Sequence, residues 1–365
     1  MDVTVLHFAN LRLGAAFPTL GLRGRDQRSQ LMTTLAGLAD LACAEQAGAV
    51  LVSGDLFGCS VPAPATCKGV QSFIAKLRDS GIPVILIQGG RDPRSLYDPR
   101  QLPVGQDYLS EASILSADRP AISVANLNLV VQLVDISPAA MEVPFVPAPI
   151  PAGGRLIGLA YQSSGEPHHL DTLAAHFATS PLCYLGVGGS PTFSTHQEGT
   201  VIACSPGVPE PLEWGQEEGS VARVRIRDDR VEVTRGRTGT RSLARRDLTL
   251  TLETARDVVS LIGDQAHQDL GLEVVLRGQC PGDVLIDPAA IEMELAQNFF
   301  NLRVVDHTEL IIDTGEQGDM PKGTVLGNFV RVMDERIRLA HEEEHLNYER
   351  EAYRLGMGLL QGGSA

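Results

Sequence analysis

Short, unbroken runs of apolar residues that end in glycine and an acidic residue mark the first quarter of the chain. Val50–Ser53 precedes a glycine and Asp55, and Ile82–Ile87 precedes a glycine pair, an arginine and Asp92. Such runs are typical of parallel strands that are buried on both faces and deliver side chains at their carboxyl ends. The run Val3–Phe8 has the same apolar character and predicts the first strand.

Helical spacing fills the intervals between these runs. Apolar residues recur every three or four positions from Asp26 to Ala47, where Gly48 supplies a C-terminal stop, and again from Val70 to Leu77. The alternation of strand and helix predicts a βαβαβ unit whose crossovers are right-handed.

Beyond this unit, and up to residue 243, short apolar runs alternate with polar connections. A proline-rich stretch without periodicity, Ser137–Pro151, interrupts them. The pattern predicts a first domain, residues 1–243, of two stacked mixed sheets with helices outside. The additional predicted strands are two within Ala121–Val134, then Leu156–Tyr161, Leu182–Gly186, Thr200–Ala203, Ser220–Ile226 and Val231–Arg235.

The character of the chain changes near residue 244, and residues 244–312 predict a small α+β module. Asp287 followed by Pro288 is a helix start, with the aspartate as N-cap and the proline at the first helical position. The other predicted elements are strands at Leu248–Leu252, Leu272–Leu276 and Leu302–Val305 and a helix at Ala255–Ile262.

Residues 313–365 predict a linker and a C-terminal helical segment. Apolar side chains between Leu326 and Ala340 form one helical stripe, and an acidic run follows at Glu342–Glu344. Such a helix either packs against its own domain or docks against a partner.

Composition bounds the class of protein. The 365 residues are 43% hydrophobic and 21% charged, as in a globular protein with a large core. The six cysteines form no CxxC pair, which favours reduced thiols over zinc ligation. No apolar run is long enough to span a membrane, and the N-terminus carries no basic leader, so we expect a cytoplasmic protein without a membrane partner.

The net charge of −15 argues against a large electrostatic footprint on nucleic acid, because nonspecific affinity comes from lysine and arginine. An arginine-rich stretch from Arg223 to Arg246 is a local exception. It either contacts nucleic acid or lies on the solvated face of two strands. Global charge therefore does not decide the partner.

The segments after the first three predicted strands carry a further pattern. Asn10 and Arg12 follow the first strand, Asp55 follows the second, and Arg91 and Asp92 follow the third. This arrangement resembles the metallophosphoesterase superfamily, and within it the DNA repair exonucleases of the SbcD nuclease-subunit type. The resemblance implies an α/β fold, a four-layer α/β/β/α sandwich with a small α+β capping domain and a C-terminal helical tail.

Members of that family hold two divalent ions, Mn²⁺ or Mg²⁺, about 4 Å apart. Their ligands arrive in D-x-H, G-D, G-N-H-D/E and G-H-x-H motifs and from a lone histidine. The resemblance places Asp55 at the bridging carboxylate and Arg91 at the catalytic histidine, which Asp92 orients in the family. Cys204–Leu212 is similar to the family's Y-P-G-S/N stretch and supports this register. The other former metal-site positions hold Asn10, Arg12, Gly90, Val187 and Gly189.

Most of this ligand set is missing. Glycine offers no side-chain ligand, arginine stays protonated, and Asn10 is a weak neutral ligand. One carboxylate beside an amide is insufficient for two hard cations, so we expect no bound cofactor. The alternative is a rearranged site with Mn²⁺ or Mg²⁺, rebuilt from histidines elsewhere. The candidates for that role are His168, His169, His176 and His196, whereas His7 lies within the first strand and is expected in the core.

We expect charge pairing to replace the metals. Arg12 and Arg91 would face Asp55 and Asp92, because bidentate arginine–carboxylate pairs suit such a geometry. Alternatively, the same arginines hold a phosphate group, which would give binding without hydrolysis.

Three functions compete. The leading interpretation is a degenerate, catalytically inactive member of the exonuclease family that serves as a DNA-repair-related binding or regulatory subunit. The resemblance implies an SbcC-like SMC-type ATPase and DNA as its partners. The second is an active metal-dependent DNA exonuclease or phosphodiesterase with a rearranged site. The third is an interaction protein without nucleic-acid contact.

Overall fold

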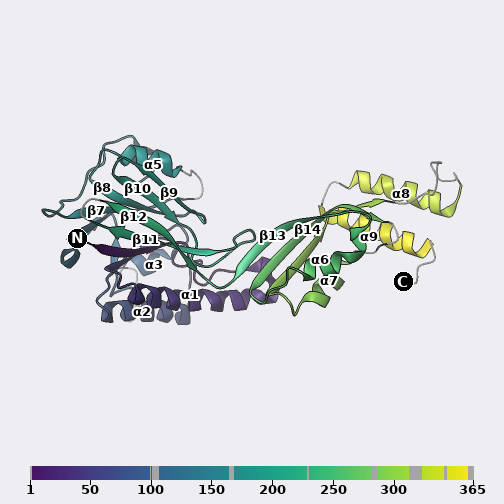
Figure 1. Ribbon diagram of the computed structural model, residues 1–365, viewed down its shortest axis with the longest axis horizontal. Coiled ribbons are helices and arrows are strands. Elements are labelled where there is room, and N and C mark those ends of the chain that lie inside the picture. Colours follow the sequence, from purple (N-terminus) through teal and green to yellow (C-terminus); the bar gives the residue numbers. More distant parts are fainter. Residues whose placement is uncertain are drawn as a thin grey trace. The chain divides into compact units, whose positions relative to one another are not determined.

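The computed structural model describes residues 2–98, 100, 107–163, 168–227, 230–281, 284, 286–311, 323–340 and 343–360. The chain divides into two compact units, Met1–Ser242 and Leu243–Ala365 (Figure 1). This division lies beside the boundary predicted after residue 243. The boundary predicted after residue 312 lies outside the described residues, so the three-domain scheme stays a prediction.

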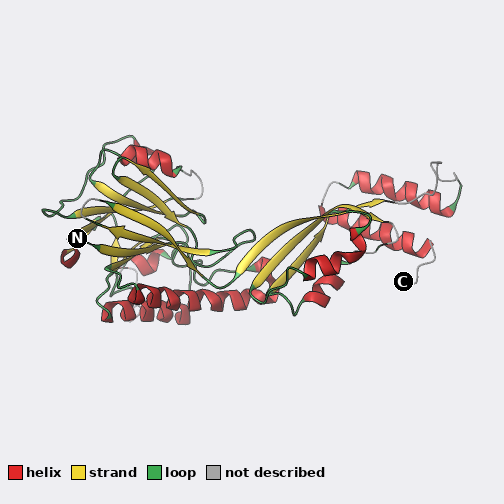
Figure 2. Cartoon of the chain, in the orientation of Figure 1, coloured by secondary structure: helices red, strands yellow, loops and turns green. Residues whose placement is uncertain are grey.

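Two six-stranded mixed sheets form the first unit (Figure 2). In the first sheet the order is β12-β11-β1-β2-β3-β4, and β1 to β4 run parallel. The three strands predicted for the βαβαβ unit are confirmed as the centre of this sheet. Its strands are β1 (Val3–Phe8), β2 (Ala49–Ser53), β3 (Val84–Ile87), β4 (Ser113–Leu115), β11 (Gly219–Ile226) and β12 (Val231–Thr238).

The second sheet has the order β5-β6-β7-β8-β10-β9. Its four central strands run parallel, and the edge strands β5 and β9 are antiparallel to their neighbours. Its strands are β5 (Ala121–Val124), β6 (Leu129–Leu133), β7 (Arg155–Tyr161), β8 (Leu182–Gly188), β9 (Phe193–Glu198) and β10 (Val201–Pro206).

Apolar residues of both sheets share one core. Val5, Leu51 and Ile85 of the first sheet belong to the same buried cluster as Ile157 and Tyr184 of the second. The sheets therefore pack face to face, and the helices lie outside them (Figure 2).

The two long helices of this unit, α1 (Gly24–Ala44) and α2 (Pro64–Asp79), pack against each other. Phe73 of α2 meets Phe8 of β1 edge to face, which places α2 on the outer face of the first sheet. On the outer face of the second sheet, α5 (Leu170–Phe177) contacts β9 and β10. The short helices are η1 (Pro18–Arg23), α3 (Arg94–Tyr97), η3 (Ala125–Leu127) and α4 (Pro138–Met141).

A buried polar chain links the two sheets at His7. The Nδ1 atom of His7 lies 2.7 Å from the hydroxyl of Tyr184 on β8, and its Nε2 atom lies 2.7 Å from the hydroxyl of Ser53 on β2. Burial lowers the pKa of His7 to about 3, so the ring stays neutral, donating from one nitrogen and accepting at the other. Gly186 makes room, because a Cβ there would lie 2.7 Å from the ring. The core position expected of His7 is confirmed.

The second unit begins with the β13-β14-β15 sheet, to which β16 adds by pairing with β14. Its helices supply Ile262 and Ile291 to a core with Leu272, Val274 and Phe299. The strands are β13 (Ser242–Leu250), β14 (Leu270–Pro281), β15 (Asn301–Asp306) and β16 (Glu309–Ile311). The helices are η4 (Thr254–Asp257), α6 (Val258–Gly263) and α7 (Pro288–Leu295).

The predicted start of α7 is confirmed. The Asp287 carboxylate accepts hydrogen bonds from the backbone N–H groups of Ala289 and Ala290, at 2.9 and 3.2 Å. These bonds satisfy two of the amide groups that a helix leaves free at its N-terminus.

Two helices, and not one, form the C-terminal segment. The predicted helix is α8 (Val325–Leu339), and α9 (Glu343–Leu360) follows it. Met333 of α8 shares a buried cluster with Tyr353 and Met357 of α9, so the predicted stripe packs within the chain. Among the described residues, no helix combines the length and the apolar character needed to cross a membrane.

Removing the Tyr184 hydroxyl tests the chain of buried polar groups. We expect Tyr184→Phe to lower the free energy of unfolding by about 1–3 kcal/mol, because His7 loses one of its two buried partners. The exposed Tyr348, changed to Phe, is the control and should leave stability unaltered. Equal effects of both variants in urea unfolding would contradict the assignment.

Candidate functional site at the carboxyl edge of the first sheet

The loops after β1 and β2 are joined to each other by their backbones. The N–H of Asn10 donates to the carbonyl of Gly54 at 3.0 Å, and that of Arg12 donates to the carbonyl of Asp55 at 2.9 Å. Asn10, Arg12 and Asp55 all have positive φ, at 58°, 51° and 51°. Such conformations cost free energy for residues other than glycine and persist only where surrounding contacts enforce them.

Asp55 is the buried centre of this edge. Its Oδ1 atom accepts a hydrogen bond from the backbone N–H of Arg91 at 2.9 Å. Its Oδ2 atom lies 3.8 Å from Nε of Arg12 and 3.6 Å from Nε of Arg91. Both guanidinium groups thus flank one carboxylate oxygen, at distances of ion pairs and not of the bidentate hydrogen bonds expected from the sequence.

Asp92 does not take part in the expected charge pairing. Its carboxylate accepts hydrogen bonds from the backbone N–H groups of Phe57 and Gly89, each at 2.7 Å. Within the described part of the chain no arginine is paired with it, because the side chain turns inward and ties the loops after β2 and β3 together. Burial raises the pKa of Asp92 to about 6, opposed by these two hydrogen bonds.

The Asn10 amide is used to join the two sheets. Its Nδ2 atom donates to the carbonyls of Ser190 and Gly207, at 2.8 and 3.1 Å. Its Oδ1 atom accepts from the backbone N–H of Gly189 at 3.0 Å. The structure therefore brings Asn10 and Gly189 together, but their contact holds the loops of the two sheets together and does not create a ligand site.

Val187 lies apart from this edge. Its side chain belongs to the buried cluster that contains Leu173 and Phe177 of α5, on the outer side of the second sheet. Residue 187 is predicted from the sequence to be a former metal-site position; in the structure its side chain points to the helix layer. Successive residues of β8 point to opposite faces, and position 187 faces the helix layer.

Tyr161, at the end of β7, is a site residue that the sequence reasoning missed. A Cβ at Gly54 would lie 2.6 Å from its ring, and a Cβ at Gly90 would lie 3.1 Å from its hydroxyl. The tyrosine thus occupies space beside the position where the resembled family has its ligating asparagine. Burial, and then the charge of Asp55, raise the pKa of Tyr161. A strand-end aromatic residue carries no sequence signal that separates it from a core residue.

A second missed residue is Glu213, whose carboxylate lies 3.2 Å from Nη1 of Arg12. It is largely exposed, so this ion pair lies at the rim of the site.

The donor set does not fit two divalent ions. Among the described residues, no group of three or more histidine, cysteine, aspartate or glutamate side chains is placed to hold a metal. His168 and His169 precede α5, His176 lies on α5 and His196 lies on β9, and none of them belongs to such a group among the described residues. Among the described residues, Asp55 faces the guanidinium groups of Arg12 and Arg91, whose positive charges repel a metal cation.

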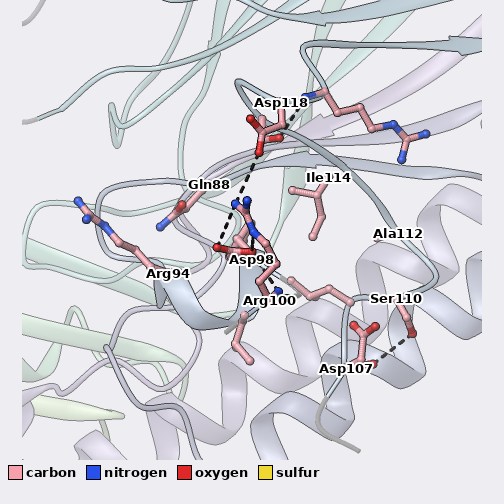
Figure 3. Close-up of a pocket in the computed structure, with 14 residues that line it drawn as sticks. Gln88, Arg94, Asp98, Arg100, Asp107, Ser110, Ala112, Ile114 and Asp118 are labelled. Atoms are coloured by element: carbon pink, nitrogen blue, oxygen red, sulfur yellow. Dashed lines mark hydrogen bonds and ion pairs between the residues drawn. The ribbon is translucent and has the colours of Figure 1, made fainter. Parts of the chain in front are cut away.

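A cavity of about 670 Å³, lined by both apolar and charged residues, lies beside this edge. Gln88, which follows β3, lines it (Figure 3). Arg100 crosses it and is paired with Asp98 at 2.9 Å and with Asp118 at 3.5 Å. Asp55 is not among the residues that line this cavity.

No protein-family model matches this sequence, and no curated protein matches it. Similar solved structures include TT1561 of Thermus thermophilus, at 15% identity and a TM-score of 0.39, covering 64% of this chain and 99% of that one. A dimetal phosphatase from Danio rerio matches at 11% identity and a TM-score of 0.42, covering 65% and 96%. An archaeal phosphodiesterase matches at 10% identity and a TM-score of 0.35, covering 64% and 99%. At these values the similarity assigns neither a family nor a function.

The raised pKa of Asp92 predicts a pH-dependent stability. Because its pKa rises from 3.8 to about 6 on folding, the folded state binds more protons within this window. The free energy of unfolding should therefore fall as pH increases from about 4 to about 6, by up to about 3 kcal/mol. The stability difference between the native chain and Asp92→Asn, measured by urea unfolding across this range, isolates the effect. Asp118→Asn, at an exposed position, is the control; a difference that is constant with pH for Asp92→Asn would refute the assignment.

Proposed function

We propose that this chain is a degenerate phosphoesterase of the DNA repair exonuclease type that binds without hydrolysing, as a regulatory or binding subunit. The observation that carries the proposal is the environment of Asp55. Its oxygens face two guanidinium groups and a backbone N–H, where a two-metal enzyme needs an ion on each side.

The surrounding side chains support the same conclusion. A ligating carboxylate must have free oxygens, and ligating histidines must be neutral and directed at the ion. Here the Asn10 amide is engaged with backbone groups of the second sheet, and Val187 faces away. Gly90 and Gly189 offer no side chain, so a metal-activated water has no support.

An SbcC-like SMC-type ATPase is the partner that we propose, with the C-terminal helices as its docking element. Beside the packed stripe, α8 exposes Val325, Val332 and Leu339, which are spaced seven residues apart. On α9, Tyr348 and Leu355 are exposed at the same spacing. Apolar residues at heptad spacing suit a partner helix or coiled coil.

DNA contact, in this proposal, comes mainly through the partner. Several residues of the arginine-rich stretch are already paired: Arg223 with Glu45, Arg225 with Asp2, and Arg227 with Glu232. Paired arginines on a chain of net charge −15 release few counterions on binding a phosphate backbone.

A hydrolysis assay tests the loss of catalysis. With Mn²⁺ and bis(p-nitrophenyl) phosphate, the native chain should show no turnover above the rate of Asp55→Ala, because neither protein can organise two ions. Turnover that depends on Asp55 would establish instead an active enzyme with a rearranged site.

Charge substitution on α8 tests the partner. We expect Val332→Lys to weaken binding to the ATPase at least about tenfold, because it places a charge in an apolar interface. Glu335→Gln, at an exposed position of the same helix, changes the net charge by the same single unit and is the matched control for charge. Equal binding of Val332→Lys and the native chain in a titration would eliminate this surface.

A further inference from the structure

The two arginines beside Asp55 keep unused hydrogen-bond donors. The Nε atom of Arg12 is buried and has no hydrogen-bond partner among the described residues. Its Nη1 atom reaches only the rim carboxylate of Glu213. For Arg91, the contact with Asp55 at 3.6 Å is the one side-chain interaction found within the described chain. A guanidinium group carries five N–H donors, so most of their capacity is open.

The charges at this edge also exceed what Asp55 neutralises. Arg12 and Arg91 are both paired with the same carboxylate oxygen, Oδ2 of Asp55. The Asp92 carboxylate points inward and accepts from a backbone N–H group. Glu213 compensates Arg12 only weakly, since 67% of its side chain is exposed and the pair is screened by water. One unit of positive charge is therefore left poorly compensated.

The edge is open to solvent at Arg91. The Arg91 side chain is 53% accessible and that of Arg12 is 14% accessible, so a small ligand would approach from the side of Arg91. Tyr161 adds a hydroxyl next to Gly90.

We propose that Arg12 and Arg91 hold a tetrahedral oxyanion, the terminal phosphate of a monoester, over the carboxyl edge of β1–β3 without any metal. Two guanidinium forks need acceptors in two directions, which a phosphate with three terminal oxygens supplies and a planar carboxylate does not. The inference rests on the proposed function, because two ions at Asp55 would displace both guanidinium groups.

The site is built differently from a metal-bound phosphate site. Asp55 holds the two arginines in place by ion pairing. Its negative charge repels the phosphate and so limits the affinity for phosphate. Binding is therefore expected to be selective for phosphate and weak, and to strengthen when the other acidic neighbour, Glu213, is neutralised.

The experiment is a calorimetric titration of the full chain with inorganic phosphate, AMP and adenosine, each with EDTA present. We expect saturable binding of phosphate and tighter binding of AMP, with none for adenosine. Arg91→Ala should weaken phosphate binding at least about tenfold, and Arg91→Lys, which keeps the charge but loses the fork, should weaken it less. Glu213→Gln should strengthen it, an effect that a purely structural role for Arg12 does not predict.

Arg28→Ala, which removes an exposed arginine from α1, is the control for nonspecific charge effects. No saturable binding of phosphate or AMP, or equal weakening by Arg28→Ala and Arg91→Ala, overturns the inference and leaves the noncatalytic role standing. Binding that appears only when Mn²⁺ replaces EDTA overturns both.

Discussion

The buried carboxylate of Asp55 must be compensated, and the way this happens determines the character of the site. An ionised carboxylate removed from water costs free energy unless cations or N–H donors surround it. Two guanidinium groups and the Arg91 amide supply that compensation from the loops after β1 and β3. The charge of this carboxylate is therefore balanced by groups of the chain itself.

Side chains and backbone groups fill the surroundings of Asp55 where the proposed degenerate site lacks ligands. The Tyr161 hydroxyl lies close to Gly90, and the Asn10 amide donates to the carbonyls of Ser190 and Gly207, which follow β8 and β10 of the second sheet. The strained backbone at Asn10, Arg12 and Asp55 is held by hydrogen bonds within the same loops. Within the described residues, this edge retains an unpartnered buried donor at Nε of Arg12.

The central strands and the loops that meet at Asp55 were predictable because the signal is local. Buried parallel strands need continuous apolar runs, and the residues that follow such runs must gather at one edge of the sheet. The elements that escaped prediction lack this signal. β4 has three residues, β9 is largely exposed, and α9 begins within an acidic run that resembles a solvated tail.

The directions of the side chains were what the sequence could not predict about the site. The motif spacing cannot tell that Val187 faces α5, that Asp92 turns toward backbone amides, or that Tyr161 reaches the edge from β7. Each depends on where a strand ends and on which tertiary neighbours surround it. The two arginines were expected to face Asp55 and Asp92, whereas in the structure both are paired with Asp55.

Metal binding by the purified chain is the most direct test of this account. Mn²⁺ would be titrated into the native chain and into Asp55→Ala, and the free ion followed by electron paramagnetic resonance. The account predicts that both proteins leave the ion free, with no difference between them. Two equivalents of Mn²⁺ bound by the native chain and lost in Asp55→Ala would contradict it.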